Sequence, residues 1–258
     1  MGHRRAFSGA LAVLPVVVSE ADHVRISIVI PTHNEADAIG HVLADLPADL
    51  VSEVLVVDSN STDGTPEIAS KLGARVIPES RRGYGRACLT GLAAASNPDI
   101  VVFLDGDYSD RPAELPILLA PILDGRADIT IGSRLGKHST PGALPWHAAF
   151  GNHLAAFLIR RLYGVRITDL GPFRAARVDV LRRLDLQETT YGWAVEMILK
   201  GALQGFRIVE VPVSYYPRIG KSKISGTLKG TVGAAWFILG LTVRYYFRHP
   251  KAGTSPAA

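Results

Sequence analysis

The chain is poor in cysteine: its single thiol, Cys88, cannot form an internal disulfide. No histidine and cysteine cluster surrounds it, so the sequence predicts no zinc site, and its Ala and Leu neighbours predict a packed thiol. No Gly-x-Gly-x-x-Gly follows the first expected strand, which argues against a nicotinamide dehydrogenase. The basic excess is small, +4 with a pI of about 9.3. It is too small to indicate nucleic acid, but it suits anionic ligands or an anionic membrane surface.

The composition is that of a globular protein, with 47% hydrophobic and 20% charged residues and no repeat or low-complexity segment. The amino terminus is similar to a signal peptide, because His3, Arg4 and Arg5 precede a mostly apolar stretch, but no clear Ala-x-Ala cleavage site follows. We therefore expect a flexible extension. The expected organisation is an extension over residues 1–24, a catalytic domain over 25–226, an apolar helix over 227–248 and a disordered tail over 249–258.

Short apolar runs alternate with helical patterns, which predicts βαβ units and a mostly parallel sheet flanked by helices. The runs expected as strands are residues 26–30, 53–57, 75–77, 100–104 and 129–131. The patterns expected as helices are residues 36–46, 66–72, 85–95 and 112–123, with Thr65 as a cap of the second. After Arg134 we expect helices over 144–163, 178–184 and 194–204 and a strand pair over 207–211 and 213–215. This second half is expected to form the wall that selects the second substrate.

Three polar clusters, residues 31–35, 58–61 and 105–107, follow expected strands. Ligands of parallel sheets bind beyond the carboxyl ends of the strands, so the clusters should converge on one crevice. Asp105 and Asp107 directly follow a buried apolar run, and two carboxylates at this spacing can reach one divalent cation, Mg²⁺ or Mn²⁺. A solvated turn at the strand end is the alternative reading of this pair alone.

Seven motifs in order resemble those of the family-2 glycosyltransferases of the GT-A fold, and most closely the dolichyl- or polyprenyl-phosphate mannose (or glucose) synthase branch. They cover about residues 26 to 226. The motifs are residues 28–35, 57–65, 82–87, 105–107, 132–134, 169–174 and 218–223. The resemblance implies an α/β, nucleotide-sugar-binding Rossmann-like fold with a carboxyl-terminal apolar helix.

The resemblance also implies a donor pocket, for which turn chemistry is the alternative. It assigns nucleotide-sugar binding to Pro31, Thr32, Glu35, Asp58, Arg82, Gly85, Asp105, Gly106 and Ser222. The family often has a second acidic residue where Ser59 stands and a Gln where Ser109 stands. We therefore expect a shorter ligand at Ser109, with water replacing the missing contact.

The resemblance further implies catalytic roles for Asp107, Asp169, Arg218 and Lys223. Arg218 and Lys223 would lie on a basic loop that stabilises the departing diphosphate, and a solvated basic turn is the alternative. Arg134 and Arg174 would face an anionic acceptor. A hydroxyl acceptor would need a base, for which Asp169 leads and Glu196 follows, although a structural ion pair with an arginine explains either acid as well.

The carboxyl-terminal segment 230–243 is uncharged, but its fourteen residues span only about 21 Å, short of the roughly 30 Å hydrocarbon core. We expect an interfacial helix, with packing on its own domain or on a second subunit as the alternatives. The expected membrane anchors are Trp236, Phe237, Tyr245 and Tyr246.

Together these features predict a metal-dependent glycosyltransferase that moves a hexose from a UDP- or GDP-sugar to a polyprenyl phosphate, and the resemblance implies that the transfer is inverting. Its expected location is cytoplasmic and peripheral, on the inner face of the cell membrane, and a homodimer is possible. The alternatives are a soluble transferase that acts on a small-molecule or glycan hydroxyl, and a nucleotide-sugar-binding subunit without turnover.

Overall fold

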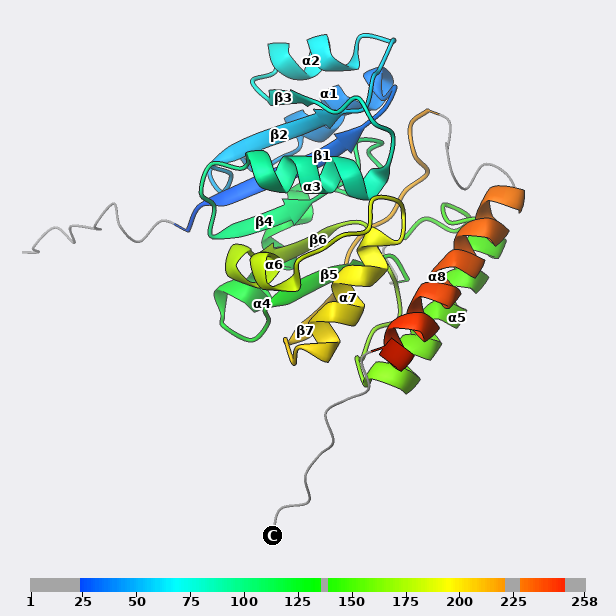
Figure 1. The fold of residues 1–258 in the computed structure, drawn as a ribbon. Helices are drawn as coiled ribbons and strands as arrows, with labels where there is room; N and C mark the ends of the chain where they lie inside the picture. The colour runs from blue at the N-terminus through cyan, green and yellow to red at the C-terminus, as the bar shows by residue number, and fades with distance from the viewer. Residues whose placement is uncertain (1–23, 136–138, 221–227, 249–258) are drawn as a thin grey trace, which may run out of the picture.

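The computed structural model describes residues 24–135, 139–220 and 228–248. Within them one sheet has seven strands in the order β3-β2-β1-β4-β6-β5-β7 (Figure 1). Neighbouring strands are parallel except at β6, which runs antiparallel to both β4 and β5. The strands are β1 Ile26–Thr32, β2 Glu53–Asp58, β3 Arg75–Pro78, β4 Ile100–Phe103, β5 Ile129–Ser133, β6 Arg174–Arg177 and β7 Ile208–Pro212.

The helices lie on both faces of this sheet, and α8 lies beside α5 at one side (Figure 1). They are α1 Ala36–Ala44, α2 Thr65–Lys71, α3 Tyr84–Ala94, α4 Leu115–Leu123, α5 Trp146–Tyr163, α6 Val178–Leu184, α7 Trp193–Leu203 and α8 Leu228–Arg248, with a short 3-10 helix over Pro112–Glu114. The predicted α/β class with a mostly parallel sheet is confirmed.

Strand β1 shows why these short apolar runs form buried strands. Ile28 and Ile30 pack on one side of the sheet with α1 and α4, whereas Val29 packs on the other side with α3 and α7. Side chains alternate between the two faces of a strand, so a strand that is covered on both faces is apolar throughout. The carboxyl ends of β1 and β4 are neighbours in this arrangement, which brings two of the polar clusters together.

Three local predictions were wrong. Strand β6 was missed because Arg174 and Arg177 at its ends leave only two alanines as an apolar signal. The expected strand over 213–215 is not a strand; Tyr215 forms only isolated bridges with Asp110 and Ser139. Thr65 is not a cap, since α2 begins at Thr65 itself and the cap residue is Gly64 in the left-handed region, with φ of 92°.

Helix α8 packs along α5 and α7 of its own domain. Its interfacial role stays a prediction, because a helix that is packed on one side can present its other side to a bilayer. The Tyr245 hydroxyl donates a hydrogen bond to Glu196 over 2.9 Å, Phe237 contacts the ring of Tyr191 edge-on, and Tyr246 contacts the ring of Tyr163. Three of the four expected membrane anchors therefore have partners inside the molecule, and Phe237 and Tyr246 each remain 36% exposed. The Trp236 side chain, residues 1–23 and residues 249–258 lie outside what the structure describes.

Within the described residues, no helix is both long enough and apolar enough to cross a bilayer.

Candidate active site

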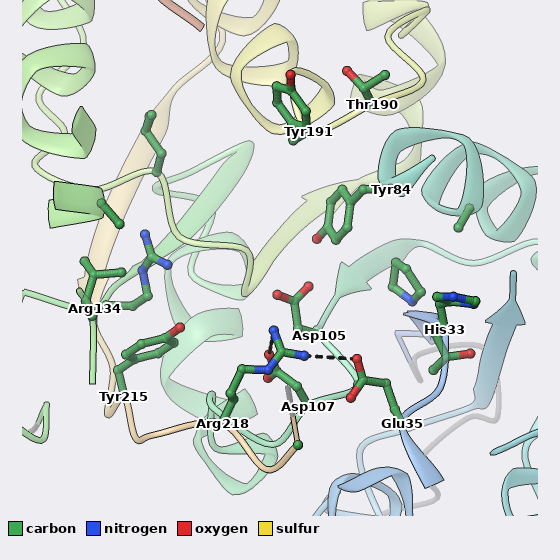
Figure 2. A pocket seen from close by; sticks show the side chains of 18 of the residues that line it. His33, Glu35, Tyr84, Asp105, Asp107, Arg134, Thr190, Tyr191, Tyr215 and Arg218 are labelled. Atoms are coloured by element: carbon green, nitrogen blue, oxygen red, sulfur yellow. Dashed lines mark hydrogen bonds and ion pairs between the residues drawn. The ribbon is translucent and has the colours of Figure 1, made fainter. Parts of the chain in front are cut away.

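A cavity of about 940 Å³ lies at the edge of the sheet where β1 and β4 end. Asp105, Asp107 and Arg218 stand in its middle, with His33 and Glu35 on one side and Arg134 and Tyr215 on the other (Figure 2). The cavity therefore has two ends of different composition that meet at the two aspartates. We call the end with Glu35 the donor end and the end with Arg134 the acceptor end.

Gly106 allows the two aspartates to lie directly against β1. A Cβ atom added at Gly106 would lie 2.9 Å from the methyl group of Thr32, too close for a normal contact. The absence of a side chain thus lets the loop after β4 pack on the end of β1. Gly106 also lines the cavity, as its predicted place in the donor site requires.

Asp107 is held in a fixed orientation by two neighbours. Its Oδ1 atom accepts hydrogen bonds from the Ser109 backbone N–H at 2.9 Å and from the Ser109 hydroxyl at 2.6 Å. Its Oδ2 atom lies 3.1 Å from Nη1 of Arg218. Ser109 therefore orients Asp107, and its expected role as a shorter metal ligand stays a prediction.

Asp105 differs from Asp107 in having a buried oxygen, Oδ1, without a hydrogen-bond partner in the described part of the chain. Burial, together with the charge of Asp107, raises the pKa of Asp105 to about 7. The Tyr84 hydroxyl is also buried without a described partner, and it points toward the same space (Figure 2). Such unpaired buried oxygens are costly unless a ligand satisfies them.

Arg218 links the two sides of the site. Its Nη2 atom lies 3.0 Å from Oε1 of Glu35, and its Nη1 atom contacts Asp107 (Figure 2). The segment around it is attached to the aspartate loop by two backbone hydrogen bonds, Tyr216 N–H to Ser109 O at 2.9 Å and Ile219 N–H to Asp107 O at 3.0 Å. The acidic loop and the segment over residues 215–220 therefore form one unit.

The predicted partners of Arg218 on the basic loop, Ser222 and Lys223, lie outside the described residues.

The two aspartates fit a divalent cation. Asp105 contributes an oxygen that has no other described partner, and Asp107 contributes Oδ2, which now faces Arg218. No group of three or more His, Cys, Asp or Glu side chains that could hold a metal occurs among the described residues. Phosphate oxygens of a nucleotide and water would complete the oxygen ligands that Mg²⁺ prefers.

At the donor end, Pro31, Thr32 and Glu35 line the cavity as predicted, and His33 lines it as well. The Glu35 backbone N–H donates to Thr65 Oγ1 over 2.8 Å, which ties the start of α1 to the start of α2.

Asp58 does not line the cavity; its carboxylate accepts hydrogen bonds from the Ser61 backbone N–H at 3.0 Å and from the Ser61 hydroxyl. Asp58 thus stabilises its own turn, which was the alternative to a role in donor binding. The neighbouring residue Ser59 lines the cavity instead.

Arg82 lines the cavity, but Gly85 does not. Gly85 is buried where α3 begins, and a Cβ atom there would meet the backbone oxygen of Glu188 and, at 2.6 Å, the side chain of Trp193. This glycine permits close packing of α3 on the segment before α7. Within this motif the glycine that lines the cavity is Gly83.

The acceptor end is built around a buried ion pair. Nε and Nη2 of Arg134 lie 2.8 and 2.7 Å from the two oxygens of Asp169, and the Arg134 backbone N–H donates to the same carboxylate at 2.7 Å. Burial would raise the pKa of Asp169, but the guanidinium and the hydrogen bonds lower it overall. A carboxylate with a lowered pKa and no exposure is a poor general base, so Asp169 positions Arg134.

Arg174 and Glu196 lie inside the fold, away from the cavity wall. The Arg174 guanidinium donates to the carbonyl oxygens of Leu170, Gly171 and Ala194 and is completely buried. The prediction that Arg174 faces the acceptor does not match this geometry. Glu196 accepts hydrogen bonds from two backbone N–H groups and from Tyr245, and it pairs with Lys200 at 2.9 Å.

Several residues of the cavity wall escaped the sequence analysis. They come from loops and from the first turns of α3 and α5, and they are Asn152, Thr190, Tyr191, Tyr215 and Tyr84. Of these, Tyr84 lies within the motif 82–87 but was given no role. Tyr215 stacks under the guanidinium of Arg134, 5.2 Å from ring centre to Cζ. The expected helix over 144–163 was a further signal for these wall residues, because the sequence analysis placed it in the wall that selects the second substrate without naming its side chains.

Comparisons with known proteins identify the family of this chain. The family model described as Glycosyl transferase family 2 matches residues 27–185. An uncharacterized glycosyltransferase of Mycobacterium tuberculosis (strain ATCC 25618 / H37Rv) is 38% identical over 211 residues, which cover 80% of this chain and 93% of that protein. An undecaprenyl-phosphate mannosyltransferase of Micrococcus luteus is 34% identical over 221 residues, covering 80% of this chain and 90% of that protein.

Among solved structures, glucosyl-3-phosphoglycerate synthase from Mycobacterium tuberculosis matches with a TM-score of 0.70 and 25% identity, covering 90% of this chain and 82% of that one. That structure is a complex with Mn²⁺, UDP-glucose and phosphoglyceric acid. The family model spans more than half of this chain, and the relatives exceed 30% identity over most of it. The chain therefore belongs to glycosyl transferase family 2, and it is a glycosyltransferase of the GT-A fold.

Proposed function

We propose that this enzyme transfers a hexose from a nucleotide sugar, UDP- or GDP-linked, to a polyprenyl phosphate, with Mg²⁺ or Mn²⁺ held by Asp105 and Asp107. The observation that carries the proposal is the position of the two aspartates between a donor end and an acceptor end of one cavity. The names of two relatives support the acceptor class: undecaprenyl-phosphate mannosyltransferase and polyprenol monophosphomannose synthase. The Mn²⁺ and UDP-glucose of the solved neighbour support the donor and the metal.

The chemistry follows from the layout of the charges. An oxygen of the acceptor phosphate attacks the anomeric carbon of the sugar, the bond from that carbon to the diphosphate breaks, and its electron pair leaves with the nucleoside diphosphate. A divalent cation bound here supplies Lewis-acid stabilisation of the charge that develops on the leaving group. Arg218, beside Asp107, adds a cation at the same place. Attack from the face opposite the diphosphate inverts the anomeric carbon.

A phosphate acceptor suits the acceptor end because it needs no strong base. The second pKa of a phosphate monoester is near 6, so the nucleophilic oxygen is already ionised at neutral pH. Both carboxylates considered as bases, Asp169 and Glu196, are buried and hold other partners. Arg134 lies on the cavity wall, where its guanidinium can orient an anion.

A second candidate is transfer to a small water-soluble acceptor. It is favoured by the solved neighbour, whose complex contains phosphoglyceric acid. Phosphoglyceric acid also carries anionic groups, so the presence of Arg134 does not distinguish a polyprenyl phosphate from a small water-soluble acceptor. The two acceptor classes differ in the length of the acceptor molecule.

The decisive experiment measures sugar transfer from a panel of UDP- and GDP-hexoses with Mn²⁺, using a polyprenyl phosphate, a short-chain phosphate and phosphoglyceric acid as acceptors. We expect one sugar donor to support transfer to the polyprenyl phosphate and to the short-chain phosphate, but not to phosphoglyceric acid. Asp107→Asn should abolish Mn²⁺-dependent binding of the nucleoside diphosphate, whereas the control Asp179→Asn on α6 should not. Nucleotide binding without transfer to any acceptor would instead establish a binding subunit.

A further inference from the structure

One face of α5 presents a row of exposed apolar side chains. Trp146, Phe150, Leu154 and Phe157 are 79%, 69%, 37% and 48% exposed. Their spacing of four, four and three residues places them on one side of the helix. The buried residues of α5, Ala155, Ala156, Ile159 and Tyr163, lie on the other side, toward the core. Single exposed apolar residues are ordinary, but a continuous row with two large aromatics marks an interaction surface.

Charge is unevenly distributed along the sequence. Residues 129–168, which include α5, and residues 211–258, which include α8, contain none of the 24 Asp and Glu of the chain. They contain twelve of its 28 Lys and Arg, so their formal charge is +12 and that of the remaining residues is −8. Helices α5 and α8 lie side by side, which joins the two acid-free segments in space (Figure 1). Among the described residues of these segments, the exposed cations are Arg160, Arg161, Arg166 and Arg244, and neither α5 nor α8 contains an acid. The described surface around the row therefore matches an anionic partner.

The row also begins where the cavity opens. Leu144 and Pro145, just before α5, and Ala148 and Gly151 in its first turns line the acceptor end, and Ile238 of α8 lines it too. Trp146 and Phe150 stand on the same two turns of α5, outside the cavity wall. The other end of the row is followed by Arg160 and Arg161, both exposed in the last turn of α5.

We propose that this face of α5, defined by Trp146, Phe150, Leu154, Phe157, Arg160 and Arg161, docks the enzyme on an anionic lipid bilayer. Aromatic side chains suit the headgroup region, and arginines attract anionic lipid. Docking in this orientation brings the apolar side of the cavity to the bilayer surface, where an acceptor with a prenyl tail can enter. The purpose of docking rests on the proposed function, but the binding itself requires no substrate.

The proposal assigns the main membrane contact to α5, because Trp146 and Phe150 are 79% and 69% exposed whereas Phe237 and Tyr246 of α8 are each 36% exposed. On α8, Phe237, Tyr245 and Tyr246 contact Tyr191, Glu196 and Tyr163. Docking of this kind is interfacial, because the row covers one side of a helix whose other side is buried in the protein.

The test is binding of the full chain to vesicles of phosphatidylcholine alone and of phosphatidylcholine with phosphatidylglycerol, measured by co-sedimentation at two salt concentrations. Trp146→Gln/Phe150→Gln should weaken binding at least tenfold, because each large side chain contributes on the order of a tenfold factor when it leaves water. The control Ile117→Gln/Leu123→Gln removes two exposed apolar residues from α4, 47% and 52% exposed, and should bind as the wild type does.

The arginines have a matched control of their own. Arg160→Gln/Arg161→Gln should reduce the preference for phosphatidylglycerol and its decline with salt. Arg182→Gln/Arg183→Gln, an exposed adjacent pair in the last turn of α6, should leave both unchanged. Melting temperature and nucleotide binding confirm that each variant is folded.

Two results would overturn the proposal. One is vesicle binding by Trp146→Gln/Phe150→Gln equal to that of the wild type. The other is a wild-type dimer that this variant converts to a monomer, since the row would then be covered by a second copy. Transfer to a short, water-soluble phosphate acceptor should survive in the variant. Loss of vesicle docking with intact short-acceptor transfer supports the proposal, whereas docking without transfer to any acceptor refutes only the proposed function.

Discussion

Removing Asp169 from its buried ion pair with Arg134 should destabilise the fold by several kcal/mol, and the molecule contains a matched control for this prediction. Asp169 is completely buried and the Arg134 side chain is 13% exposed. Asp169→Asn would leave the guanidinium inside the protein without its counter-charge, which typically costs about 3–5 kcal/mol. For a chain of this size that corresponds to a fall in melting temperature on the order of 10 °C.

The control is the pair between Arg207 and Asp128, which repeats the same bonding pattern at the surface. The backbone N–H, Nε and Nη2 of Arg207 lie 2.8, 3.0 and 2.7 Å from the Asp128 carboxylate, and the Arg207 side chain is 54% exposed. Solvent screens this pair, so Asp128→Asn should cost less than about a third as much as Asp169→Asn. The two ion pairs have the same pattern of hydrogen bonds, so a difference in the cost of the two substitutions reports the difference in burial.

Urea unfolding at pH 7 measures both variants, and acid titration adds a second criterion. The folded pKa of Asp169 lies below its ordinary value of 3.8. The wild-type advantage over Asp169→Asn is therefore present above that pH and is lost as the pH falls further. Equal costs for the two aspartates, or an advantage that does not change in acid, would refute the reasoning.

Three further outcomes test the site and the fold. Arg218→Ala should lower kcat by about 10²–10³ while leaving affinity for the free nucleoside nearly unchanged, since the guanidinium acts on phosphate; equal losses of nucleoside and nucleoside diphosphate affinity would contradict this. Gly106→Ala should cost about 1–3 kcal/mol in thermal unfolding and weaken donor binding, because the new methyl group meets Thr32 at 2.9 Å, and unchanged stability would rule out that contact. The pKa of Glu79 is lowered to about 2, chiefly by the hydroxyl of Thr90. The difference in unfolding free energy between wild type and Thr90→Val should therefore shrink as the pH falls from about 4.5 toward 2. A difference that stays constant over this range would show that the Thr90 hydroxyl does not lower the pKa of Glu79.

The sequence predicted the parallel part of the sheet closely because its strands are buried on both faces. The expected run over 100–104 differs from β4 by one residue, and that over 53–57 differs from β2 by one. The antiparallel β6 was missed because Ala175 and Ala176 are the only apolar residues of a strand that is short and carries an arginine at each end. Apolar periodicity is a weak signal for such a strand.

The candidate site was predicted better for its loops than for its side chains. Asp105, Asp107, Glu35 and Arg218 do meet in one cavity, because neighbouring parallel strands end at the same edge. The sequence does not tell whether an arginine side chain points into a cavity or into the fold. The Arg174 side chain points into the fold, where it donates hydrogen bonds to backbone carbonyl oxygens.

The same limit applies to carboxylates and to glycines that lie in motifs. Asp58 accepts hydrogen bonds within its own turn, and Gly85 allows α3 to pack closely on its neighbours. Neither role could be predicted from the motif alone, because each depends on the contacts made in the folded structure.

The backbone hydrogen bonds between the aspartate loop and residues 216–219 have a consequence for how the enzyme is made. Asp107 and Ile219, which they join, are about 110 positions apart in the sequence. At roughly 5–20 residues per second, a ribosome delivers the second partner on the order of 5 to 20 s after the first. During that interval the nascent chain holds its acidic loop without the cation of Arg218. Interrupted translation products that end before this segment should therefore be catalytically silent, even if their first strands have already assembled.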